Sequence, residues 1–208
     1  SFKGSISSLE AGYAVKKGIL KADPDAQVEV LPIADGGEGT MEALVLAKQG
    51  SYRTLQVSGP LGETISCRYG LIDGQTAVIE MAQAAGLPLV PVSKRNPMNT
   101  TTRGVGEMIA DAIKLGCRNF IIGIGGSATN DGGVGMLEAL GFKFLDGQGK
   151  EIPMGAKGLE FLLEIQLKNQ LPQLKECRFR VACDVSNPLC GENGCSVIYG
   201  PQKGADQR

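Results

Sequence analysis

Histidine is absent from this chain of 208 residues. Its absence excludes Ser-His-Asp and Cys-His nucleophilic sites, and it also excludes histidine as a general base. Any proton transfer must therefore be carried out by Asp, Glu, Lys, Tyr or Cys side chains.

The chain also lacks an excess of charge of one sign and lacks long apolar segments. Its formal net charge is −1, so no basic field is present to attract nucleic acid or an anionic membrane. Its apolar runs are far shorter than the roughly 20 residues that span a bilayer, and we expect no secretory leader because the sequence does not open with the apolar segment of one. We therefore expect a cytoplasmic protein whose partner is neither nucleic acid nor a membrane.

Six cysteines are present, but their context argues against disulfides. Cys117, Cys177 and Cys183 lie in or beside segments expected to form the core, where free cysteine behaves as a small apolar residue. A chain this long and this well patterned does not need covalent cross-links. The sequence has no C-x-x-C pair and no histidine, which argues against a structural zinc site. We expect reduced thiols throughout.

Three apolar segments of strand character each run directly into a glycine-rich loop that carries an aspartate. They are Val28–Ile33, Phe120–Ile124 and Phe179–Cys183, followed by Asp35, Asp131 and Asp184 respectively. In open α/β sheets, ligands bind at the carboxyl ends of the strands. The recurrence therefore predicts a single polar cleft that tolerates phosphate.

The rest of the pattern is that of an α/β protein with one or two domains, and 42% of its residues are hydrophobic. Periodicity and turn residues predict helices at residues 5–21, from Asp35 through Val45 with Gly50 at the C′ position, at 104–115 and at 134–140. They predict an antiparallel hairpin at 52–57 and 63–71, a strand at 77–81, a connector at 87–97, and a second hairpin from 142–145 through the Asp146-Gly147 turn.

The first hairpin suggests a change of domain near residue 51, although the second domain could instead be an insertion. Loops at both ends, with no strand before and no helix after them, suggest a fragment of a longer protein.

The loop at residues 123–133 has the composition of an anion-binding site. Its consecutive glycines free backbone N–H groups to form a concave nest, and the loop leads into a helix amino terminus. No Gly-Lys-Ser/Thr follows, so it is not a Walker A loop. The expected phosphate- or nucleotide-binding residues are Gly125, Gly126, Ser127, Thr129 and Asn130.

Two other interpretations of this loop stay open. Gly123-x-Gly125-x-x-Ala128 follows a strand and Asp146 lies about 20 residues on, as in a dinucleotide-binding fingerprint. That pattern would indicate an NAD(P)-dependent oxidoreductase, whereas a glycine-rich turn used only for close packing would indicate no ligand at all.

The acidic loops predict cation binding and proton transfer. Carboxylates beside a phosphate nest repel phosphate unless a cation bridges them, so Asp35 and Asp131 are candidate Mg²⁺ ligands. Asp35 could also contact a hydroxylated substrate, or could only cap a helix. Asp184, at the end of a strand, is the best candidate for a general base that takes a proton from a substrate hydroxyl. Turn formation is the alternative for Asp184.

Basic side chains could complete the cleft. Lys3 would place its ammonium there if the first loop also follows a strand, and Lys203 is a weaker candidate of the same kind. Arg103 could hold a substrate carboxylate through two hydrogen bonds. Solvent-exposed surface positions are the alternative for all of them.

The order of these motifs along the chain resembles that of the type-1 glycerate kinase family. The blocks are SFKGS at 1–5, ADGGEGT at 34–40, GPLG at 59–62, VIEMA at 78–82, TTTxGxGE at 100–107, IGIGGSATNDGG at 122–133, CDVxNPLxG at 183–191 and GPQKGA at 200–205. The block at 122–133 is the most specific, and the series covers nearly the whole chain.

The resemblance implies ATP-dependent phosphorylation of D-glycerate with Mg²⁺, with 2-phosphoglycerate as the favoured product. It implies two α/β domains, one of them Rossmann-like with a mostly parallel sheet and containing residues 1–51, and a second with antiparallel hairpins at 52–208. It places the family's proposed base at Asp184. From the residues themselves we expect Lys3 to take part in catalysis, and we expect the substrate-binding set to be Asp35, Gly36, Gly37, Arg103 and Asn187.

Features expected of the family are missing here, namely a first strand before Ser1 and a long portion beyond Arg208. Both domains are therefore expected to be incomplete, and the fragment alone could be inactive. A non-catalytic module that binds sugar acids stays open as a third function, and the oligomeric state is undetermined.

Overall fold

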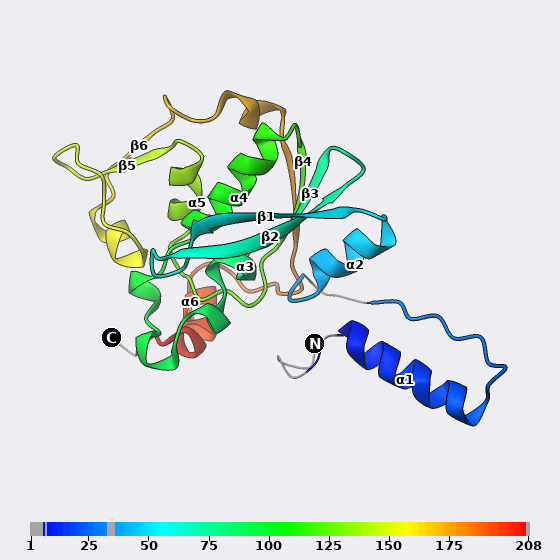
Figure 1. Cartoon of the computed structure of the whole chain (residues 1–208). Helices are drawn as coiled ribbons and strands as arrows, with labels where there is room; N and C mark the ends of the chain where they lie inside the picture. Colours follow the sequence, from blue (N-terminus) through cyan, green and yellow to red (C-terminus); the bar gives the residue numbers. More distant parts are fainter. Residues whose placement is uncertain (1–5, 7, 33–35, 207–208) are drawn as a thin grey trace.

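The centre of the fold is a mixed five-stranded sheet with the strand order β1-β2-β3-β4-β7. The computed structural model describes residues 6, 8–32 and 36–206 (Figure 1). The antiparallel strands are β1 (Ser51–Ser58), β2 (Thr64–Ile72) and β3 (Thr76–Glu80). Strands β4 (Asn119–Gly123) and β7 (Arg178–Ala182) continue the sheet parallel to β3. The expected first hairpin and the α/β fold class are confirmed.

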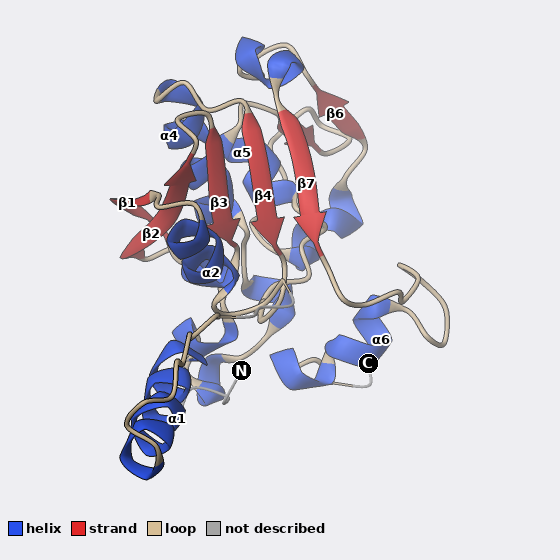
Figure 2. Ribbon diagram, turned by 90° about the vertical axis from the view of Figure 1, so that its right-hand side faces the viewer, coloured by secondary structure: helices blue, strands red, loops and turns tan. Residues whose placement is uncertain are grey.

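Helices cover both faces of this sheet (Figure 2). Helix α2 (Thr40–Ala47) packs on β2 and β3 from one side, while α4 (Arg103–Lys114) and α5 (Val134–Ala139) lie on the other. The remaining helices are α1 (Ser8–Ala22), α3 (Ala82–Ala85) and α6 (Cys195–Tyr199), and the 3₁₀ turns are Leu87–Leu89, Val92–Lys94, Pro97–Asn99, Ala156–Phe161, Pro172–Glu176 and Pro201–Lys203. Helix α2 buries Met41 and Val45 in the same core as the strands, so residues before position 51 also contribute to that core. The domain boundary near residue 51 stays a prediction.

The core lies between the sheet and the helices. Helix α4 turns a periodic stripe inward, and its Met108 and Ile109 pack with Tyr69, Val78 and Phe120 in one cluster. Each fully buried apolar side chain of this size contributes roughly 1.5–3 kcal/mol. All five residues of β3 are buried, whereas two of the five residues of β4 are half-buried.

The segment at residues 28–33 was expected to form a strand, and in its described part, residues 28–32, it does not. A strand needs a partner, and this segment pairs with no other described strand. Helix α1, which precedes it, projects from the body of the molecule (Figure 1). Its apolar residues Val15 and Ile19 are 62% and 41% exposed.

Of the two turn predictions, the position of Gly50 needs correction. Gln49, with φ of 50°, takes the left-handed C′ position after α2, and Gly50 follows it by donating its N–H to Val45 O at 2.8 Å. The predicted hairpin at the Asp146-Gly147 turn forms as a short one: Leu145 and Glu151 make an antiparallel bridge, Asp146 N donates to Lys150 O at 2.8 Å and Ile152 N donates to Phe144 O at 3.0 Å. On its other side, β5 (Lys143–Leu145) pairs with β6 (Glu164–Gln166).

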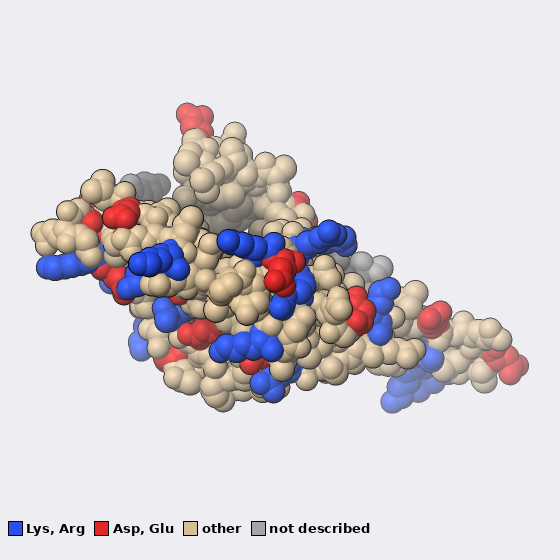
Figure 3. All heavy atoms as spheres, turned by 90° about the horizontal axis from the view of Figure 1, so that it is seen from above, with Lys and Arg blue, Asp and Glu red and all other residues tan. Residues whose placement is uncertain are grey.

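All six cysteines are free thiols, as expected. Along the described part of the chain, no helix is both long enough and apolar enough to cross a membrane. Basic and acidic side chains are interspersed on the face shown in Figure 3.

Candidate functional site

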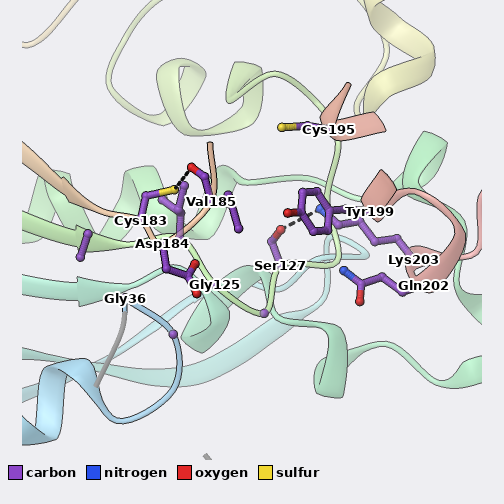
Figure 4. Close-up of a pocket in the computed structure, with 14 residues that line it drawn as sticks. Gly36, Gly125, Ser127, Cys183, Asp184, Val185, Cys195, Tyr199, Gln202 and Lys203 are labelled. Carbon is purple, nitrogen blue, oxygen red and sulfur yellow. Dashed lines mark hydrogen bonds between the residues drawn. The ribbon is translucent and has the colours of Figure 1, made fainter. Parts of the chain in front are cut away.

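The three parallel strands end at the same level, and the glycine-rich loops begin there. Glu80 pairs with Gly123 and Gly123 pairs with Ala182, so the carboxyl ends of β3, β4 and β7 form one edge. A pocket of about 410 Å³ opens at this edge. Its lining includes Gly36, Gly37, Ile124, Gly125, Gly126, Ser127, Ala182, Cys183, Asp184, Val185, Cys195, Tyr199, Gln202 and Lys203 (Figure 4).

The loop after residue 35 rests directly on the ends of β4 and β7. A Cβ atom at Gly36 would lie 2.5 Å from Ala182 O, and one at Gly123 would lie 2.6 Å from Gly36 O. Gly125 donates its N–H to Gly36 O at 3.2 Å. Glycine is required here because backbones from three distant parts of the chain come into contact.

Glu80, the last residue of β3, anchors this loop by a hydrogen bond to the start of α2. This role was not predicted from the sequence. The side chain is 5% exposed, and its Oε1 accepts the Met41 N–H at 2.8 Å at the start of α2. Burial raises the pKa of Glu80, while hydrogen bonds from Met41 and Gly39 oppose that rise. The feature of the sequence that could have indicated this role is the single acid that ends the apolar segment at residues 77–80.

The predicted nest divides between two hollows. Gly125, Gly126 and Ser127 line the pocket with Asp184, and Gly126 has a φ of 72°. Thr129 and Asn130 instead line a neighbouring hollow of about 290 Å³ that shares Ser127 with the first. The nest therefore reaches the pocket through its first three residues.

Asp131, a predicted Mg²⁺ ligand, is engaged within the protein. Its carboxylate is 2% exposed and accepts hydrogen bonds from Thr102 N and Oγ1, both at 2.9 Å, from Gly135 N at 3.2 Å and from Gly133 N at 3.1 Å. These bonds join the starts of α4 and α5. The geometry therefore favours a structural role for Asp131 over metal binding.

Asp184 differs from the other strand-end acids because it is exposed. It follows β7 and lies in the pocket beside Gly125 and Gly36, across from Tyr199 and Lys203 (Figure 4). Within the described part of the chain, its carboxylate accepts no hydrogen bond from the protein. It is available to a ligand.

Asn187 does not line this pocket. Its Oδ1 accepts the Tyr199 hydroxyl hydrogen at 2.8 Å, and its Nδ2 donates to Asn193 O at 3.0 Å. Asn187 thereby fixes the segment that carries Tyr199, one of the lining residues.

Arg103 also lies elsewhere. Its guanidinium contacts Glu107 at 3.4 Å and Glu138 at 3.6 Å, in a hollow apart from Asp184. The pairing with two glutamates leaves little of its charge for a substrate carboxylate. Lys3 and Asp35 lie outside the described residues.

Asp146 closes a turn and does not clamp a ribose. Its Oδ1 accepts Gln148 N at 2.8 Å and Lys150 N at 2.9 Å. These backbone bonds lower the pKa of Asp146. The residue is not part of the pocket lining, so the site lacks the acid that a dinucleotide fingerprint needs.

Comparison with known proteins places this geometry in a family. The glycerate kinase family model matches residues 1–208. The chain is 53% identical over 208 residues to a protein named glycerate 2-kinase from Escherichia coli (strain K12). The matched region is 100% of this chain and 55% of that protein. It is 52% identical over 206 residues to a protein named glycerate kinase from Bacillus subtilis (strain 168). Here the matched region is 99% of this chain and 54% of that protein.

A solved structure agrees with these matches. The crystal structure of a protein assigned as glycerate kinase 2 from Salmonella typhimurium LT2 superposes with a TM-score of 0.88 at 48% identity. The superposition covers 100% of this chain and 56% of that one. The chain spans about half the length of the relatives it matches, and it belongs to the glycerate kinase family.

Proposed function

We propose that this protein is an ATP-dependent kinase that phosphorylates D-glycerate, with 2-phosphoglycerate as the favoured product. The observation that carries the proposal is the joint lining of one pocket by the anion nest and by Asp184. Family membership supplies the substrate class. We also propose a cytoplasmic location, which is consistent with its free thiols.

The nest would hold the transferred phosphoryl group. Gly126 and Ser127 border the pocket, and their backbone N–H groups and the Ser127 hydroxyl are donors of the kind that stabilise the charge that phosphoryl transfer places on the equatorial oxygens. Such transfer depends mainly on positioning and electrostatic stabilisation, so a rigid nest suits it. The loop is held from outside the pocket, because Ala128 N donates to Ala85 O at 2.8 Å.

Asp184 would accept the proton of the reacting hydroxyl. As the glycerate oxygen forms its bond to the γ-phosphorus, the bond from that phosphorus to the ADP oxygen breaks. The hydroxyl proton passes to the Asp184 carboxylate and from there to solvent, which is possible because Asp184 is exposed. A carboxylate is the appropriate base in a chain without histidine.

The donor set fits a Mg²⁺ ion held mainly by phosphate and water. Asp184 is the single carboxylate among the described lining residues, and Asp35 immediately precedes Gly36 of the lining. One or two carboxylates together with substrate phosphates are the usual protein contribution to Mg²⁺ binding. When bound, the ion would neutralise phosphate charge. Asp35 stays the predicted ligand, while Asp131 positions the loop.

The test measures ADP release with glycerate in a coupled assay. It uses the protein at the full length of its relatives, here called the family-length protein, because this chain spans about half of that length. Asp184→Asn is expected to lower kcat by roughly 10²–10⁴, the usual contribution of general-base catalysis. The matched control is Asp146→Asn, at an acid outside the pocket, and it should leave kcat unchanged.

Each alternative has its own outcome in this experiment. If Asp184→Asn keeps kcat within about tenfold, then the base assignment is wrong. Glycerate binding without ADP release would indicate a non-catalytic module. Nicotinamide binding that disappears in Asp146→Asn would indicate an oxidoreductase. Phosphorus NMR of the product distinguishes 2-phosphoglycerate from its isomer.

A further inference from the structure

Lys203 reaches into the site from the last 3₁₀ turn (Pro201–Lys203), and its ammonium bonds the nest loop directly. Its Nζ donates to Ser127 Oγ at 2.8 Å (Figure 4). It also donates to Thr129 O at 2.7 Å. Lys203 and Ser127 both line the pocket that contains Asp184. Two segments that are more than 70 residues apart in sequence therefore meet at one charged group.

The charge of this ammonium is not balanced by a contacting carboxylate. Both hydrogen-bond acceptors are neutral, and no ion pair joins Lys203 to an acid of the described residues. The Asp131 carboxylate acts on it electrostatically, but that carboxylate is occupied by its own hydrogen bonds. Burial lowers the pKa of Lys203, as expected for a cation that has lost water. A partly buried, unpaired cation is costly unless an anion approaches it.

Donors are left over in this arrangement. An ammonium has three N–H donors, and Lys203 uses two of them. Because Ser127 Oγ accepts a bond from Lys203, its own hydroxyl hydrogen is free to point elsewhere. The pocket therefore offers one N⁺–H, one O–H and the backbone N–H groups of Gly126 and Ser127, because the Gly125 N–H is already donated to Gly36 O.

We propose that Lys203 is a ligand-contacting residue that, together with the Ser127 hydroxyl and the backbone N–H groups of Gly126 and Ser127, binds a phosphate oxyanion in this pocket. The assignment rests on the proposed kinase function, and it names the group that this part of the pocket takes. Lys203 has a second effect. Its bonds hold the segment of Cys195, Tyr199 and Gln202 in place as a wall of the pocket, so that wall and nest are fixed together.

The first experiment measures binding and not turnover, so that its result is independent of whether glycerate is the substrate. Isothermal titration of the family-length protein with inorganic phosphate, ADP and glycerate gives three dissociation constants. Lys203→Met is expected to weaken phosphate and ADP binding by roughly tenfold to a hundredfold, as for loss of a charge-assisted hydrogen bond. Lys203→Arg, which keeps the charge, should lose less. Lys175→Met, at an exposed lysine outside the pocket, is the control and should change nothing.

The outcomes separate phosphate from carboxylate as the bound anion. Weaker phosphate and ADP binding with unchanged glycerate binding supports the proposal. An unchanged phosphate dissociation constant in folded Lys203→Met overturns it, and so does a loss confined to glycerate. If the proposal holds while ADP release with glycerate is absent, then the phosphate site stands and the substrate assignment fails.

A second measurement needs no variant. Inorganic phosphate should protect Lys203 of the unmodified protein from acylation by an amine-reactive reagent, as read by mass spectrometry. Lys175 serves as the internal reference, because it is exposed and outside the pocket. Equal labelling of Lys203 with and without phosphate overturns the proposal, even if Lys203→Met does not fold.

Discussion

Replacement of Gly36 by alanine tests whether the site depends on direct backbone contact between its loops. Gly36 has a φ of 95°, and a Cβ there would lie 2.5 Å from Ala182 O and 2.7 Å from Ala182 C. Those atoms belong to β7 and cannot rotate away as a side chain could. A shift of Gly36 would also disturb its N–H bond to Thr40 Oγ1 (3.1 Å) and the bond that its oxygen accepts from Gly125 (3.2 Å).

Gly39 in the same loop provides a matched comparison. Its φ is 93°, almost the same as that of Gly36, but a Cβ there would have nothing within 4 Å. Gly39→Ala should therefore cost only the left-handed backbone penalty, about 1–2 kcal/mol. Gly36→Ala should cost that amount plus about 1–3 kcal/mol for overpacking against β7. The expected difference between the variants is about 1–3 kcal/mol.

Urea unfolding of the family-length protein, followed by circular dichroism, gives the free energy of unfolding for each variant. Phosphate titration of the same samples reports on the nest, because Gly125 bonds Gly36. We expect Gly36→Ala to lose both stability and phosphate affinity, and Gly39→Ala to lose a little stability. Equal losses of stability in the two variants would refute the close approach of the loop to β7.

Two further predictions concern the buried acids. The raised pKa of Glu80 means that this carboxyl group holds a proton more tightly in the folded protein than in the unfolded chain. The contribution of Glu80 to the free energy of unfolding is therefore present below about pH 4.5 and is lost as pH rises through the pKa of the folded protein. In urea unfolding from pH 4 to 8, the stability of the unmodified protein relative to Glu80→Gln should thus fall as pH rises, and a difference that grows with pH would show that the sign is wrong. Asp131→Asn should destabilise the protein by about 2–3 kcal/mol without any metal present, because a buried N–H of Thr102 or Gly135 then faces an amide NH₂. A variant with unchanged thermal stability but impaired Mg²⁺-dependent turnover would restore Asp131 as a metal ligand.

The elements of the sheet were largely predictable because their information is local. Strands β1 and β2 alternate in polarity around a glycine turn, and α4 has a 3.6-residue apolar stripe that packs into the core. The segment at 28–33 has equally strong strand composition, yet residues 28–32 form none. Composition gives a segment the capacity to pair, whereas a strand exists only where a partner lies beside it.

The site was predictable in its location but not in how its acids are used. A glycine loop after a strand indicates the carboxyl edge, and Gly36, Gly125 and Asp184 do meet in one pocket. The sequence could not show that Arg103 pairs with Glu107 and Glu138, because that contact depends on the packing of α4 against α5.

Three acids at or after the carboxyl ends of the parallel strands have different surroundings in the folded chain, and this difference favours one of them for chemistry. Glu80 and Asp131 are buried and bonded to backbone N–H groups at helix starts, where a carboxylate stabilises unpaired donors. Replacement of either acid would disturb the loop before it affected any reaction. Asp184 accepts no bond from the described residues and faces the pocket. A base must exchange a proton with its ligand, and a carboxylate whose lone pairs are occupied does so poorly. Among these three, Asp184 is therefore the acid whose loss should affect turnover more than stability.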